Sequence, residues 1–331
     1  MQETDQTKFA IGLSPFLTEE DTLESLDSFC KRNSHRIYHW YLSPPYSTWK
    51  FKEGKSLKDI RSRRKEFIAQ LKVLKDNNQK IQLAINQPYF KYFSKFKWAC
   101  WLGVILCILD WKLFYSKYID IDSIVCIDSY VSTIKRFFPK TSLTCSFNSD
   151  LVSNRYKYIS KFNTIVVGRQ LLRNIDFLES IKKNHNLKIE LLLNCACHPL
   201  CNFKCIDKQD SCYLLQKKLI RQKGVDWCVA YQSLLPSELR LYPEGLIDYY
   251  KISSRPSSLS WLEEEMDFYE SKNYLYDLLP KIPLNEVWQR ACSTNAISRV
   301  LLEECPNLNT VIEHKEELWK KALNTDVKPI I

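Results

Sequence analysis

Cysteine is the residue type whose spacing in this sequence most directly indicates chemistry. Residues 194–205 read NCACHPLCNFKC and directly follow the apolar run IELLL. The cysteines in and after this stretch are Cys195, Cys197, Cys201, Cys205, Cys212 and Cys228. Structural zinc sites favour two close cysteine pairs, whereas iron–sulfur clusters need four thiolates, often three local and one remote. The spacing favours an iron–sulfur cluster, with zinc or a metal-free group of thiols as the alternatives.

Several cysteines, and the histidine within the cluster, could have roles other than binding a metal. Cys195 is close enough to Cys197 to compete with it as a ligand, or it could be a reactive thiol. His198 could be a ligand or a proton donor, and a plain loop residue is the favoured interpretation. Cysteines that are scattered through apolar or helical stretches are expected to be small core residues. They are Cys30, Cys100, Cys107, Cys145, Cys292 and Cys305.

The thirteen cysteines also bear on the compartment. The N-terminus, MQETDQTKF, is polar and has no apolar run of the kind found in secretory signals. In a reducing compartment, clustered thiols bind metals more often than they form disulfides. We therefore expect a cytoplasmic protein.

Composition and charge limit the classes of function. The chain has 331 residues, of which 45% are hydrophobic, and this indicates a globular protein. Much of the net charge of +10 lies in residues 50–75. A basic helix face can attract RNA, anionic membrane or an acidic peptide, although a solvated surface is the favoured interpretation. The six glycines are too dispersed for a phosphate loop or a dinucleotide fingerprint.

The most apolar run is WACWLGVILCIL, residues 98–109. A membrane-spanning helix needs about 20 apolar residues, and this run is shorter. We expect a buried core helix and no membrane span.

Short β-branched and aromatic runs alternate with longer helical segments along the chain. The strands are expected at 8–14, 36–42, 81–86, 123–128, 142–147, 164–169, 188–194 and 248–254. Helices are expected between them, for example at 18–33, where Thr18 or a neighbour can cap the first turn, and at 174–185. This order predicts a (β/α)8 TIM-type barrel over residues 1–280, with a helical C-terminal extension at 281–331.

The predicted barrel gives the cysteines a position. Cys195 and Cys197 fall at the C-terminal end of the seventh strand, and barrel enzymes build their active sites at that rim. The interval 195–247 before the eighth strand is long, and 225–232 is a candidate extra strand.

The stretch LKIELLLNCACHPLCNFKC resembles a segment of proteins related to peptidase family U-32, the collagenase-like peptidases. The resemblance places Asn194, Cys197 and Cys201 on the family's asparagine and first two cysteines. It extends over roughly residues 120–275 through FFPKTSLTCSFNSD, FNTIVVGRQLLRNIDFLESIKK and VDWCVAYQSLLPSELRLYPEGLIDYYKISSR. The matching positions in these segments are Ser146, Asn148, Arg169, Arg173, Cys228, Lys251 and Arg255. The chain departs from the family in that Cys205 stands near the family's histidine.

The resemblance implies a 4Fe-4S cluster at the barrel rim. Its ligands would be Cys197, Cys201, Cys228 and either Cys205 or Cys212. Characterised relatives act in oxygen-independent hydroxylation of ubiquinone precursors and of RNA bases. A similar modification of an aromatic, RNA or peptide substrate is the function that we expect.

Polar residues at the expected strand ends would face the same rim. They are Asn86, Asp128, Asn148, Arg169 and Arg255. Arg169 and Arg255 suit an anionic substrate, because guanidinium pairs bidentately with carboxylate or phosphate. Together with Asn148 they are the candidate catalytic residues, and rim salt bridges are the alternative. His39, in the second strand, is expected to make a packed polar contact.

Other functions stay open. One is a non-catalytic metal-binding scaffold, or a subunit of a hetero-oligomer with a related chain. A peptidase is disfavoured, since the sequence has neither a Gly-x-Ser-x-Gly nucleophile elbow nor a His-Glu-x-x-His zinc helix.

Overall fold

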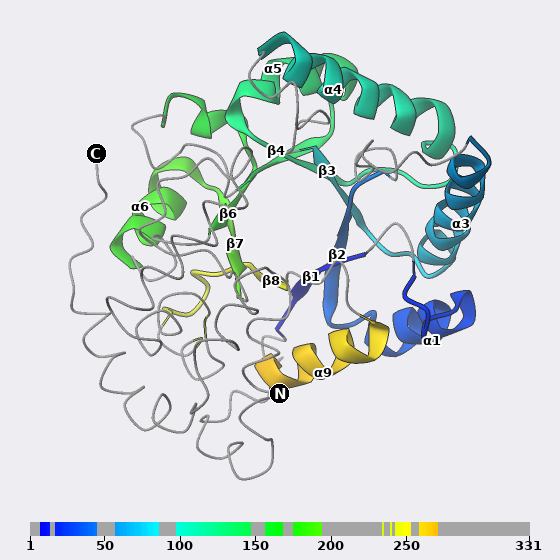
Figure 1. Cartoon of the computed structure of the whole chain (residues 1–331). Helices are drawn as coiled ribbons and strands as arrows, with labels where there is room; N and C mark the ends of the chain where they lie inside the picture. The colour runs from blue at the N-terminus through cyan, green and yellow to red at the C-terminus, as the bar shows by residue number, and fades with distance from the viewer. Residues whose placement is uncertain are drawn as a thin grey trace, which may run out of the picture. The chain divides into compact units, whose positions relative to one another are not determined.

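Eight parallel strands form one closed barrel in the order β1 to β8 (Figure 1). This computed structural model describes residues 7–13, 17–44, 57–85, 97–146, 156–167, 175–193, 234, 239, 242–252 and 258–270. The strands are β1 (Phe9–Gly12), β2 (Ile37–Leu42), β3 (Ile81–Ile85), β4 (Ser123–Cys126), β5 (Ser142–Cys145), β6 (Thr164–Val167), β7 (Lys188–Leu192) and β8 (Tyr249–Ile252). All eight expected strands are present, and the prediction of a (β/α)8 barrel is confirmed.

Helices connect the strands. They are α1 (Leu23–Asn33), α3 (Leu57–Asp76), α4 (Lys97–Asp110), the π-helix η2 (Trp111–Tyr115), the 3₁₀ helix η3 (Asp128–Tyr130), α5 (Val131–Phe137), the 3₁₀ helix η5 (Tyr156–Lys161), α6 (Ile175–His185) and α9 (Leu259–Glu270). The expected helix at 174–185 is confirmed as α6. The expected extra strand at 225–232 and the helical extension at 281–331 lie outside the described residues, and both stay predictions.

The first helix begins later than the expected residue 18. Thr22 is its N-cap, because its hydroxyl accepts from the amide of Ser25 at 3.1 Å while Ser25 Oγ accepts from the amide of Thr22 at 2.8 Å. This reciprocal capping box satisfies two amides that a helix start leaves without partners. The hydroxyl of Thr18 instead bonds Asp21, at 2.7 Å.

Strand residues alternate between an apolar outer face and a more polar inner face of the sheet. On β3, Ile81 and Leu83 are fully buried on one side, and Gln82 lies between them. The amide of Gln82 donates to Thr144 on β5 at 3.1 Å, past the intervening strand β4. Such a bond is possible only on the concave side, so Gln82 and Thr144 point into the barrel.

The chain divides into two compact units. One comprises Met1–Val166 with Ser254–Glu263, and the other comprises Val167–Ser253 with Glu264–Ile331. The predicted domain boundary at residue 280 lies outside the described residues.

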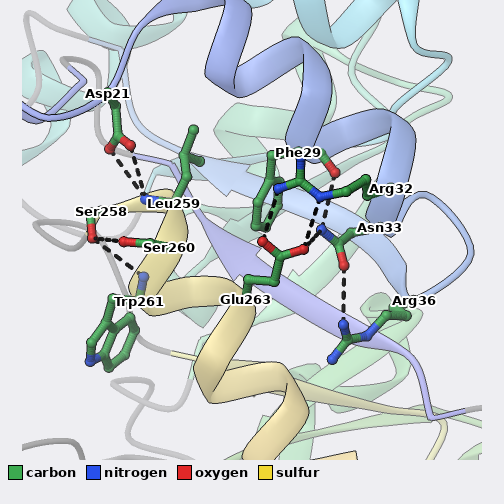
Figure 2. A network of polar contacts seen from close by, with 10 residues as sticks. All are labelled: Asp21, Phe29, Arg32, Asn33, Arg36, Ser258, Leu259, Ser260, Trp261 and Glu263. Atoms are coloured by element: carbon green, nitrogen blue, oxygen red, sulfur yellow. Dashed lines mark hydrogen bonds and ion pairs between the residues drawn. The ribbon is translucent and has the colours of Figure 1, made fainter.

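Within the first unit, polar contacts fix the start of α9 against α1 (Figure 2). The guanidinium of Arg32 donates to both carboxylate oxygens of Glu263, at 3.1 and 2.9 Å. Asn33 also donates to Glu263, at 3.1 Å. The carboxylate of Asp21 accepts from the amide of Leu259. These bonds join segments that are far apart in the sequence.

Helix α4 corrects one expectation. Its inner face is buried, as expected, because Val104, Cys107 and Ile108 are fully covered. Its outer face is not, since Trp101 and Leu102 are 37% and 42% exposed. The run is therefore apolar on both faces, and only one face packs on the barrel. Within the described part of the chain, no helix combines the length and hydropathy needed to cross a bilayer.

Candidate active site at the end of strand β7

The two described residues that flank the segment with the predicted ligands, Leu193 and Leu234, are in contact with each other. Strand β7 ends at Leu192, and the amide of Leu193 donates to the carbonyl of Lys251 on β8 at 2.9 Å. The carbonyl of Leu193 in turn accepts from the amide of Leu234, also at 2.9 Å. The hydroxyl of Tyr269 on α9 donates to the carbonyl of Leu234 at 3.1 Å. Residues 194–233 are thus bracketed by two backbone groups in contact at the carboxyl end of β7.

A buried ion pair lies just before this point. Lys251 Nζ on β8 is 2.5 Å from Glu190 Oε1 on β7, and the two side chains are 9% and 0% exposed. Leu192 is the backbone partner of Lys251, whereas Glu190 is the partner of Tyr249, so the ion pair crosses the two strands diagonally. Two buried charges are tolerable here because each neutralises the other.

The opposite end of the same strand pair is also fixed by a carboxylate. Asp248 accepts from Lys182 on α6 and from the amide of Ile189, both at 2.8 Å. The amide of Asp248 donates to the carbonyl of Ile189 at 3.0 Å. These contacts set the register of β7 against β8, and that register brings Lys251 within reach of Glu190.

In the first unit, several barrel strands also carry buried polar side chains. Besides Gln82 and Thr144, His39 on β2 is buried and packs edge-on against Tyr38, with ring centroids 5.2 Å apart. The burial of His39 agrees with the expected packed position, and its expected polar contact stays a prediction. Ser146, directly after β5, is 1% exposed, and its amide donates to the carbonyl of Cys126 at 2.9 Å.

The predicted site residues themselves lie outside the described part of the chain. They are the candidate ligands Cys197, Cys201, Cys205, Cys212 and Cys228 and the candidate catalytic residues Asn148, Arg169 and Arg255. The preceding strands are present, but each ends two residues before its predicted end: β5 at Cys145, β6 at Val167 and β8 at Ile252. Of the other expected rim residues, Asp128 starts η3 after the end of β4. Asn86 lies outside the described residues.

The cysteines that the structure describes are core residues. Cys30, Cys107, Cys126 and Cys145 are free thiols, and all are buried. Burial raises the pKa of Cys30 to about 12 and also raises the pKa of Cys126. Among the described residues, no group of three or more histidine, cysteine or acidic side chains is arranged to hold a metal ion. The expectation of core residues is confirmed for Cys30, Cys107 and Cys145.

Glu190 was not among the residues expected to be functional. A signal for it exists in the sequence, because Glu190 is the one acidic residue in the run KIELLL. With a period of two, a charge inside an apolar strand must point into the barrel and needs a partner there. The identity of that partner, Lys251, depends on the pairing of β7 with β8.

Comparison with known proteins finds a relative that is similar to this chain over about half of its length. No family model matches the chain. The chain is 23% identical over 181 residues to the uncharacterized protease MJ1657 of Methanocaldococcus jannaschii, and the match covers 50% of this chain. It spans 54% of that relative's length, or about half.

Solved structures with which the chain shares a likeness include a U32 peptidase. The U32 peptidase Mk0906 superposes with a TM-score of 0.45 at 11% identity, over 75% of this chain and 92% of that chain. CpGH84B superposes with a TM-score of 0.37 at 11% identity, over 96% of this chain and 67% of that chain. The chain is thus similar to a protein named as a protease, and this agrees with the resemblance to a peptidase family that the sequence indicates.

Proposed function

We propose that this chain is an iron–sulfur enzyme similar to the U-32 peptidases, which carries out an oxygen-independent modification, namely hydroxylation, of an aromatic, RNA or peptide substrate. The observation that carries the proposal is the hydrogen bond between Leu234 and Leu193. It ties both ends of the cysteine-bearing segment to the carboxyl end of β7. In (β/α)8 enzymes the catalytic groups lie at this end of the strands.

The donor set of the segment fits such a cluster. Residues 195–228 supply more thiols than one cluster needs, whereas the described cysteines are buried singly or in pairs in the core. Cys197, Cys201 and Cys228, with Cys205 or Cys212, would hold a 4Fe-4S cluster. When bound, the cluster supplies one-electron redox chemistry.

The chain's other residues would bind and orient the substrate. Arg169 and Arg255 follow the ends of β6 and β8, and their guanidinium groups suit a carboxylate or phosphate. Asn148 follows β5 and offers an amide for a polar substrate group. The ion pair of Lys251 with Glu190 holds β8 against β7, and so fixes the strand ends on which the cysteine segment and Arg255 depend.

The test is anaerobic purification followed by iron and sulfide analysis and visible spectroscopy. We expect a brown protein with iron and acid-labile sulfide. Cys197→Ala and Cys228→Ala should each remove the chromophore, and Cys107→Ala, which alters a buried core thiol, is the matched control and should keep it. A colourless protein with stoichiometric zinc would overturn the redox assignment and leave a metal-binding scaffold. If both ligand variants keep the chromophore, the ligand set is wrong.

A peptidase is the second candidate, because the relative from Methanocaldococcus jannaschii is named as a protease. Incubation with gelatin and with fluorescent peptides, with and without added metal, tests it. Turnover that survives the loss of the chromophore in Cys197→Ala would favour the peptidase over the hydroxylase.

A further inference from the structure

In the part of the chain that the structure describes, every large hydrophobic side chain with high exposure lies on one short segment. These residues are Trp101 (37%), Leu102 (42%), Leu109 (39%), Leu113 (69%) and Phe114 (38%). We call this set the apolar stripe. Large apolar groups that gather on a surface mark an interaction site more often than single exposed residues do.

The stripe follows from helical geometry. Leu102, Leu109 and Leu113 recur at intervals of seven and four residues, and this spacing places them on one face of a helix. Helix α4 continues directly into the π-helix η2, in which the amide of Ser116 donates to the carbonyl of Trp111 at 3.0 Å. A π-helical turn contains one more residue than an α-helical turn, and in η2 this turn leaves Leu113 on the exposed side.

The stripe is held in place by packing from beneath. The ring of Tyr115 is buried and stands edge-on to Phe67 of α3, with centroids 5.1 Å apart. Trp101 stands edge-on to Tyr130, with centroids 6.0 Å apart. The guanidinium of Arg64 lies 3.6 Å from the centroid of Phe114. The exposed side chains are therefore presented by a fixed frame.

Within residues 101–118 the exposed charged side chains are cations, and the exposed Asp120 follows this interval. Between Trp101 and Tyr118 the chain has one carboxylate, Asp110, which is 6% exposed and paired with Arg64 at 2.7 Å. The cations of the same interval, Lys112 and Lys117, are exposed. This face thus offers apolar groups and positive charge together.

We infer that the apolar stripe docks on the surface of an anionic phospholipid bilayer. Leucine, tryptophan and phenylalanine side chains would enter the boundary between headgroups and acyl chains, and Lys112 and Lys117 would pair with lipid phosphates and carboxylates. Charge complementarity selects this occupant over a second copy of the chain, because two copies of this face would bring like charges together. The docking is peripheral and independent of the proposed cluster.

The test is co-sedimentation of the full chain with vesicles. We expect binding to phosphatidylcholine vesicles that contain phosphatidylserine, weaker binding to phosphatidylcholine alone, and weakening by added salt. Leu109→Ser with Leu113→Ser should lower the partition coefficient at least tenfold, because two leucines lose apolar burial. Lys112→Gln with Lys117→Gln should lower it roughly thirtyfold at low salt, from about 1 kcal/mol for each lysine.

The control carries the same change of charge outside the stripe. The control variant is Lys183→Gln with Lys188→Gln, at exposed positions on α6 and β7. Its partition coefficient should fall by much less than the partition coefficient of the Lys112 and Lys117 variant. Leu113→Ser alone, at the most exposed position, is the variant least able to disturb folding, and circular dichroism checks each protein. Absence of binding to either kind of vesicle would overturn the inference. So would a dimer that Leu113→Ser converts to a monomer without any change in vesicle binding, since the stripe would then be an interface between copies.

Discussion

Lys251 Nζ lies 2.5 Å from Glu190 Oε1, and this ion pair is enclosed between the last two strands of the barrel. It stands beside the backbone bond that links Leu193 to Lys251. The ion pair therefore holds β7 and β8 together close to the point where the cysteine-bearing segment follows β7.

Replacement of Lys251 by Met should be strongly destabilising. The change leaves the Glu190 carboxylate buried without its cation, and the loss of one partner of a buried pair costs about 3–5 kcal/mol in the free energy of unfolding. Lys251→Met with Glu190→Gln should recover part of that loss, because no uncompensated charge remains. Urea denaturation of the two variants measures both effects. A single variant that unfolds like the wild type would contradict the burial of the pair.

Gly12 is required by the ring of Tyr41. A Cβ atom at Gly12 would lie 2.7 Å from both Cζ and Oη of Tyr41, closer than real contacts allow. Tyr41 is 4% exposed and has little room to move, so Gly12→Ala should cost about 1–3 kcal/mol in the free energy of unfolding. In a Tyr41→Leu background most of this penalty should disappear. Equal penalties in both backgrounds would show that the clash is not with Tyr41.

Glu263 should contribute a pH-dependent part of the stability. Its hydrogen bonds from Arg32 and Asn33 lower the pKa of its carboxyl. The contribution is therefore present above the unfolded pKa of about 4.3, and it is lost as the pH falls through the lower folded pKa. The difference in the free energy of unfolding between wild type and Glu263→Gln should be largest near neutral pH and should shrink in acid. Glu264→Gln, at the exposed neighbouring position, is the control. If its free energy of unfolding depends on pH in the same way as that of Glu263→Gln, the pH-dependent stability does not come from Glu263.

The described core thiols should resist alkylation in the folded protein. Thiolate is the reactive form, and burial raises the pKa of Cys30 to about 12. At mildly alkaline pH, iodoacetamide should leave Cys30 and Cys126 unmodified until the protein is unfolded in urea. Peptide mass spectrometry reports each site separately. Rapid alkylation of Cys30 without denaturant would mean that α1 opens far more readily than its packing indicates.

The start of α1 shows the limit of sequence reasoning on local structure. Thr18 and Thr22 both precede the acidic and apolar pattern of the helix, and propensity alone does not choose between them. Ser25, three residues after Thr22, completes the capping box, whereas Thr18 is taken up by Asp21. The hydrophobic pattern predicted that a helix exists here, but the side-chain bonds decide where it begins.

By itself, the sequence determined the eight strands, the barrel class and the candidate ligands, because β-branched and aromatic runs of strand length alternate with helical segments, and because the cysteines are clustered. These are local signals. Only the tertiary structure decided that Glu190 neutralises Lys251, that Leu234 returns to Leu193, and that one face of α4 is left uncovered. Each of these depends on which segments meet in space, and the pairing of distant strands and the packing of helices on them are not encoded in any single stretch of the chain.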